Sequence, residues 1–180
     1  MIKKVCFYGP ESTGKSLTAI RMATYYGTIS VPEVSREMLI TNDFTVEDII
    51  RVGHAQTERI LKLAASANKL LFCDTDLITT QIYSKHYLGV VPPILYELEK
   101  QIIFDRYFFF DIDVPWIADG LRNLGDRREE MKAIFLEELT KRNIEYVLVH
   151  GSHEQRDQII RDEIEKIIPP SPTSSPQFPR

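Results

Sequence analysis

One eight-residue stretch near the N-terminus constrains the fold of this 180-residue chain more than any other feature. Residues 9–16 read GPESTGKS and match the pattern G-x-x-x-x-G-K-[ST]. The apolar residues 4–8 before it predict a strand, and helix-forming sequence follows from Gly14. A strand, a glycine-rich loop and a helix in this order are typical of a loop that binds phosphate groups. We therefore predict an α/β fold built around this loop.

Each residue type in the loop suits a polyphosphate ligand. Gly9 and Gly14 permit backbone angles at which successive N–H groups face phosphate oxygens. The helix start adds unpaired amides and the positive end of the helix dipole. We expect Lys15 to reach the β- and γ-phosphates and the Ser16 hydroxyl to ligate Mg²⁺. The predicted nucleotide-binding residues of the loop are Gly9, Glu11, Ser12, Thr13, Gly14, Lys15, Ser16 and Leu17.

Short apolar runs alternate with amphipathic stretches up to about residue 168. The other predicted strands are residues 28–31, 69–73, 108–112 and 145–149. Predicted helices begin near residues 14, 43, 75, 93, 128 and 153. This alternation indicates βαβ crossovers and hence a P-loop NTPase fold, with a five-stranded, mainly parallel sheet and helices on both faces. We expect one domain over residues 1–168 and a disordered Pro/Ser-rich tail over residues 169–180.

Composition and charge argue against several other classes of protein. Hydrophobic residues make up 43% and charged residues 27%, an ordinary globular balance without a run long enough to span a membrane. The N-terminus enters a predicted strand directly and leaves no room for a signal peptide, so we expect a cytoplasmic protein. A net charge of −4 gives no general reason to bind nucleic acid or a membrane. Cys6 and Cys73 are expected to be buried thiols.

Carboxylates follow two of the predicted strands. Asp74 ends an apolar strand, as a Walker B carboxylate does, and is expected to hold the Mg²⁺ shell. Asp76 is either the cap of the next helix or a substrate residue. Glu33 is placed to accept a proton from an attacking hydroxyl, and Arg36 to neutralise phosphate. A surface ion pair between Glu33 and Arg36 is an equal alternative.

Residues 119–128 have the glycines and arginines of a mobile lid that closes during phosphoryl transfer. We expect Arg122 and Arg127 to cover the transferring group, because guanidinium forks suit its spread charge. The alternative is a solvated, charged helix start.

Two further features flank the predicted lid. Trp116, just before it, is either a core residue or a surface on which a base stacks, best of all a cationic ring. Gly151 and Ser152 form a turn after the last predicted strand, where nucleotide kinases often seat the adenine edge. Both are therefore included in the predicted nucleotide site.

Taken together, four stretches resemble the kinase domain of the bacterial bifunctional NAD-biosynthesis regulators. They are GPESTGKS (9–16), PEVSRE (32–37), DTDLITTQ (74–81) and PWIADGLR (115–122). The similarity covers nearly the whole chain except the tail. The family's domain is a ribosylnicotinamide kinase, so the resemblance implies ATP- and Mg²⁺-dependent phosphorylation of the 5′-hydroxyl of nicotinamide riboside, which yields nicotinamide mononucleotide.

The resemblance also implies site residues and leaves alternatives open. It makes Trp116 a stacking partner for the pyridinium ring and does not decide whether Asp76 or Glu33 is the base. The substrate-binding residues that it implies are Glu33, Arg36, Asp76, Gln81, Trp116 and Asp119. The alternatives are a kinase for another nucleoside-like alcohol and a non-catalytic ATP-binding regulatory module. Since few residues precede the loop, we expect neither the nucleotidyltransferase nor the DNA-binding domain that full-length members of the family carry.

Overall fold

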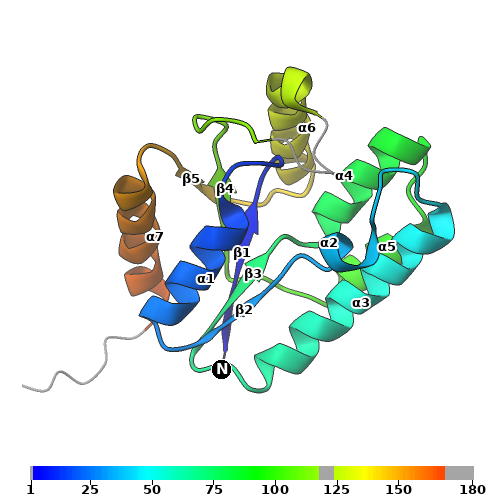
Figure 1. Cartoon of the computed structure of the whole chain (residues 1–180). Coiled ribbons are helices and arrows are strands. Elements are labelled where there is room, and N and C mark those ends of the chain that lie inside the picture. The colour runs from blue at the N-terminus through cyan, green and yellow to red at the C-terminus, as the bar shows by residue number, and fades with distance from the viewer. Residues whose placement is uncertain (1, 118–123, 169–180) are drawn as a thin grey trace, which may run out of the picture.

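The computed structural model describes residues 2–117 and 124–168, which contain one five-stranded sheet (Figure 1). The strands are β1 (Lys3–Tyr8), β2 (Ile29–Val31), β3 (Leu70–Asp74), β4 (Arg106–Phe110) and β5 (Tyr146–Val149). They are all parallel and lie in the order β2-β3-β1-β4-β5. The predicted sheet is therefore confirmed. Strand β4 ends earlier than predicted, where the Asp111 side chain accepts a hydrogen bond from the N–H of Ile112 and turns the chain.

The helices occupy the segments between the strands. They are α1 (Lys15–Tyr25), α2 (Ser35–Met38), α3 (Val46–Ala64), α4 (Leu77–Leu88), α5 (Pro93–Glu99), α6 (Arg128–Lys141) and α7 (His153–Ile167), with a short 3₁₀ turn, η1 (Gly125–Arg127). Capping boxes at Thr45 and Ser152 satisfy free amides at the starts of α3 and α7. Helix α2 was not predicted, because four residues are too few to show helical periodicity.

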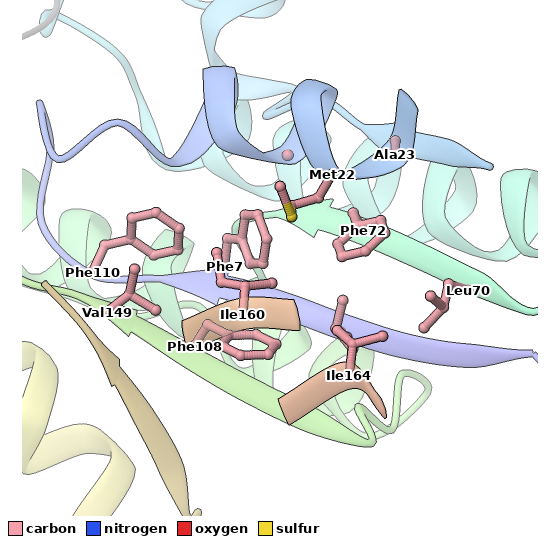
Figure 2. Packing of buried hydrophobic residues seen from close by; sticks show 12 residues of the cluster. Phe7, Met22, Ala23, Leu70, Phe72, Phe108, Phe110, Val149, Ile160 and Ile164 are labelled. Atoms are coloured by element: carbon pink, nitrogen blue, oxygen red, sulfur yellow. The ribbon is translucent and has the colours of Figure 1, made fainter. Parts of the chain in front are cut away.

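Alternate residues of each strand point to opposite faces of the sheet. On one face, Phe7, Phe72 and Phe108 pack against α1 and α7, and Figure 2 shows Met22 of α1 and Ile160 of α7 beside these rings. The ring centroids of Phe7 and Phe72 are 5.7 Å apart, within the range of favourable aromatic pairs. Helices α1 and α7 therefore cover this face.

The opposite face carries the other half of the core. Cys6, Tyr8 and Phe109 pack there against α4 and α6, and both cysteines are buried and free, as predicted. The helix after β1 therefore covers one face of the sheet, and the helix after the neighbouring β3 covers the other. Such a divergence opens a crevice at the carboxyl ends of the two strands. Among the residues that the structure describes, no helix has both the length and the apolar character needed to cross a membrane.

Candidate active site

The predicted phosphate loop lies at this crevice, between β1 and α1. Gly9 has φ +132°, and a Cβ there would lie 2.8 Å from the carbonyl oxygen of Phe110, so a larger residue does not fit. Gly14 has φ +87° and forms the N-cap of α1 without a capping side chain. A helix start without a capping side chain, behind a glycine-rich turn, is the arrangement that binds anions at helix starts.

Lys15 is buried beneath the loop, with only 8% of its surface exposed. Its Nζ donates hydrogen bonds to the carbonyl oxygens of Gly9 and Pro10, at 2.9 and 2.6 Å. The loop's own carbonyl groups thus hold the ammonium group against the turn where phosphate groups are expected to bind.

A cavity of about 400 Å³ extends from the loop across the crevice. Its polar wall includes loop residues together with Glu33, Arg36, Thr75, Thr79, His153 and Arg156. Its apolar wall is formed by Leu39, Phe44, Ile49, Val52, Tyr83 and Tyr87, which come from α3, α4 and the segment between α2 and α3. We call this apolar wall the aromatic recess. The phosphate-binding loop and the aromatic recess therefore share one cavity.

The carboxylate of Asp74 and the hydroxyl of Ser16 lie side by side at the edge of the loop. Asp74 is buried, accepts a hydrogen bond from the Ser16 side chain, and has an Oδ1 atom without a hydrogen-bond partner among the described residues. Burial, followed by the negative charge of Glu33, raises the pKa of Asp74 to about 6, against the opposing effect of Lys15. A buried carboxylate with an unused oxygen beside a hydroxyl fits the hard oxygen coordination that Mg²⁺ prefers.

Glu33 faces the cavity and pairs with Arg36. Its carboxylate accepts hydrogen bonds from Ser35 Oγ at 2.8 Å and from Arg36 Nε at 3.0 Å. All three side chains line the cavity. The structure therefore shows the ion pair and places both residues on the cavity wall, while their roles toward a hydroxyl and a phosphate stay predictions.

The structure does not bring Asp76 and Gln81 into the cavity. Asp76 is 1% exposed and caps α4, where it accepts hydrogen bonds from the N–H of Thr79 at 2.9 Å and from the hydroxyl of Tyr107 at 3.0 Å. Gln81 donates to Glu99 and accepts from Arg142 at 2.8 Å, which joins α4, α5 and α6. For Asp76 the structure favours the helix cap that the sequence left as an alternative.

Trp116 is not among the residues that line the cavity, although its neighbours Pro115 and Ile117 are. The indole packs on Gly125, where a Cβ would lie 2.8 Å from the ring, and Nε1 is 3.4 Å from Glu11 Oε1. This contact joins the phosphate loop to the segment that precedes α6.

The other predicted lid and adenine residues are placed as follows. Arg127 is exposed, forms an ion pair with Glu130 and does not line the cavity. Asp119 and Arg122 lie outside the described residues. Gly151 and Ser152 precede α7, and the structure brings α7 rather than this turn to the cavity wall, through His153 and Arg156.

Arg156 is the most prominent residue that we did not predict. Although it is 1% exposed, it donates hydrogen bonds to three carbonyl groups, those of Gly151 at 3.0 Å, Thr13 at 2.7 Å and Asp111 at 3.2 Å, and it forms an ion pair with Asp113. It therefore links the last helix to the phosphate loop. The sequence held a signal for it, because an arginine occupies the same helix face as the core residues at positions 160 and 164.

Phe44 and Tyr83 in the aromatic recess, and Thr75 after β3, were also missed. Aromatic residues at helical spacing usually belong to a core, so no pattern distinguished Phe44 or Tyr83. Thr75 stands between two aspartates, and nothing in the sequence distinguishes it from other threonines; only its backbone conformation does.

The parallel sheet, its strand order and the glycine-rich loop at the crevice define a P-loop NTPase fold. The family model described as "AAA domain" matches residues 4–156. The chain belongs to this family.

Individual proteins are similar to the chain in sequence or in fold. The "Trifunctional NAD biosynthesis/regulator protein NadR" of Escherichia coli (strain K12) is 34% identical over 159 residues, which are 82% of this chain and 38% of that protein. The chain thus spans about two fifths of its length. A crystal structure of NadR protein in complex with NR has a TM-score of 0.80 at 20% identity, covering 97% of this chain and 54% of the other. Deoxyadenosine kinase from M. mycoides has a TM-score of 0.64 at 14% identity, covering 91% and 99%.

Proposed function

We propose that the protein is an ATP-dependent kinase that phosphorylates the 5′-hydroxyl of nicotinamide riboside to give nicotinamide mononucleotide. The observation that carries this proposal is the single cavity that joins a phosphate loop to an aromatic recess, with the Glu33 carboxylate on its wall. The similarity to NadR, one structure of which holds NR, supports nicotinamide riboside as the acceptor. The shared fold with a deoxyadenosine kinase supports phosphoryl transfer to a nucleoside.

The residues of the cavity have distinct roles in the proposed reaction. The loop amides and Lys15 bind the triphosphate and stabilise the charge on the γ-phosphoryl group. Ser16 and Asp74 would hold Mg²⁺, which reduces the negative charge of the phosphate oxygens when it is bound. Arg36 adds a positive charge on the acceptor side of the loop.

Glu33 is the proposed base, since Asp76 is buried and occupied by its hydrogen bonds. The acceptor oxygen forms a bond to the γ-phosphorus while the bond from that phosphorus to the β–γ bridging oxygen breaks. ADP leaves with the electron pair of that bond, and Glu33 takes the hydroxyl proton. A water-poor cavity limits transfer of the phosphoryl group to water instead.

The aromatic recess is the proposed site of the nicotinamide ring. Aromatic faces stack on planar rings and attract a cationic one. The resemblance assigns this stacking to Trp116, and we retain that assignment as an alternative within the proposal. Substitution of Phe44 by alanine should raise the KM for the acceptor far more than the KM for ATP, whereas substitution of Trp116 should do so only if its indole stacks on the ring.

The decisive experiment measures ADP release with and without nicotinamide riboside, with Lys15→Ala as the inactive control. Acceptor-dependent ADP release, together with formation of nicotinamide mononucleotide, supports the proposal. A panel of uncharged nucleosides tests the alternative, and a preference for one of them would replace nicotinamide riboside as the substrate. Nucleotide binding without any acceptor-dependent ADP release would identify a regulatory module instead.

A further inference from the structure

Thr75 combines an unusual backbone conformation with a buried hydroxyl that is unpaired within the part of the chain that the structure describes. Its φ is +75°, in a region that β-branched residues rarely adopt. Its side chain is 3% exposed, and its Oγ1 has no hydrogen-bond partner among the described residues. Buried hydroxyl groups are nearly always hydrogen-bonded, so an unpaired one calls for an explanation.

The neighbouring residues impose this conformation from both sides. The N–H of Thr75 donates to the carbonyl oxygen of Phe7 at 3.0 Å, which extends the pairing of β3 with β1. The next residue, Asp76, is held by Thr79 and Tyr107 as the cap of α4. The backbone must therefore turn sharply at Thr75. Strained conformations that the surrounding structure maintains are concentrated at functional sites.

The position of Thr75 indicates what its hydroxyl serves. It follows directly after Asp74 at the crevice between β1 and β3, and it lines the cavity together with Gly9, Lys15 and Glu33. Because β3 lies between β1 and β2 in the sheet, Thr75 at the end of β3 lies between the phosphate loop, which follows β1, and Glu33, which follows β2. A hydroxyl donor at this point can reach a phosphoryl oxygen, which is the strongest acceptor that the proposed reaction brings there.

We propose that Thr75 is a further phosphoryl-binding residue, whose hydroxyl donates a hydrogen bond to the terminal phosphoryl group of the nucleoside triphosphate. This inference rests on the proposed function, because it requires a triphosphate in the loop. The hydroxyl, unpaired within residues 2–117 and 124–168, then gains a charged partner, and the strained backbone keeps it in place before the ligand arrives.

The test compares the dissociation constants of MgATP and MgADP, measured by calorimetry, in the wild-type protein and three variants. Thr75→Val keeps the shape and the branched Cβ but removes the hydroxyl, and Thr75→Ser keeps the hydroxyl. Thr57→Val is the matched control, since the hydroxyl of this buried residue of α3 donates to the carbonyl oxygen of Gly53 and lies outside the cavity.

Thr75→Val should weaken MgATP binding by roughly 10- to 100-fold, the effect of losing a hydrogen bond to a charged group, and MgADP binding by less than about twofold. Thr75→Ser should retain MgATP affinity within about threefold. Because Oγ1 has no hydrogen-bond partner among the residues that the structure describes, the unliganded Thr75→Val protein should melt no lower than the wild type. Thr57→Val should melt lower and bind both nucleotides as the wild type does.

Three outcomes would overturn the inference. The first is an equal loss of MgATP and MgADP affinity in Thr75→Val, which would indicate a general effect on the loop. The second is a lower melting temperature of the unliganded Thr75→Val protein with unchanged nucleotide affinities, which would indicate a structural role. The third is a loss confined to the acceptor's KM. A wild-type protein that binds no MgATP would refute the proposed function as well, and a wild-type protein that binds MgATP but phosphorylates no nucleoside would refute the proposed function alone.

Discussion

Replacement of Arg156 by methionine is expected to destabilise the protein and to weaken nucleotide binding. The guanidinium group donates hydrogen bonds to the carbonyl oxygens of Thr13, Gly151 and Asp111, and it pairs with the carboxylate of Asp113. Methionine fills much of the same volume but supplies no donor. Four acceptors therefore lose this donor in one substitution, and among the described residues Asp113 keeps only the hydrogen bond from the N–H of Gly151.

The size of the effect follows from the burial of these groups. Loss of one partner of a buried ion pair costs about 3–5 kcal/mol of unfolding free energy, and each buried carbonyl left unpaired adds about 1–3 kcal/mol. Because the Asp113 side chain is 34% exposed, water can solvate its carboxylate and offset part of the loss. We expect a net loss of at least about 3 kcal/mol, which corresponds to a melting temperature lower by at least about 6 °C for a domain of this size.

The functional effect comes through the carbonyl of Thr13, which belongs to the phosphate loop. Without its donor the loop is less well ordered before binding, so the dissociation constant for MgATP should rise by about tenfold. Chemical unfolding without nucleotide measures the first effect, and calorimetry with MgATP, at a temperature where the variant is folded, measures the second. Lys166→Met on the same helix removes an exposed charge and serves as the control. A loss below about 1 kcal/mol with unchanged MgATP affinity would refute the assigned role of Arg156.

Lys15→Ala should lower kcat by about 10²–10³-fold, and by more than Glu33→Gln does. A loose phosphoryl-transfer transition state depends more on charge stabilisation than on proton removal. Steady-state kinetics of the two variants check this order. Burial raises the pKa of Asp74 to about 6. Between about pH 4 and 6 the folded protein therefore keeps a proton that the unfolded chain releases, so the free energy of unfolding of the metal-free protein falls as the pH rises through this range. Asp74→Asn should therefore stabilise the metal-free protein at pH 7 by about 1–3 kcal/mol and give no gain near pH 4, as pH-dependent urea titrations would show. Gly125→Ala should displace the indole of Trp116, the only tryptophan, because the new methyl group would lie 2.8 Å from the ring; an unchanged tryptophan emission spectrum would contradict this packing.

Several features of the fold and site could be read from the sequence because short-range patterns encode them. The glycines of residues 9–16, the strand before them and the helix after them predicted the phosphate loop. The apolar run before Asp74 predicted a strand that ends in a carboxylate, and the structure has both. Both predictions depend on residues that are neighbours along the chain, so the backbone between them leaves few alternatives.

Other residues show where local patterns were insufficient. Asp76 and Gln81 stand in a motif that resembles a substrate site, yet their partners Tyr107 and Arg142 lie 31 and 61 residues further along the chain. Only the packing of α4 against β4 and α6 shows that these polar groups bind one another rather than a ligand. The partner of a polar side chain is decided in space, and a single sequence does not contain that distance.

The sequence by itself thus determined the class of fold and the position of the phosphate loop, because strand and helix periodicity and glycine conformation are properties of adjacent residues. The tertiary structure alone decided the aromatic recess of the cavity, where Phe44, Tyr83 and Tyr87 converge. It alone brought Arg156 to the carbonyl oxygen of Thr13, a residue 143 positions earlier in the chain. Such contacts exist only after the helices have packed on the sheet, since an unpaired polar group is costly once it is buried and most of them then pair within a few ångströms.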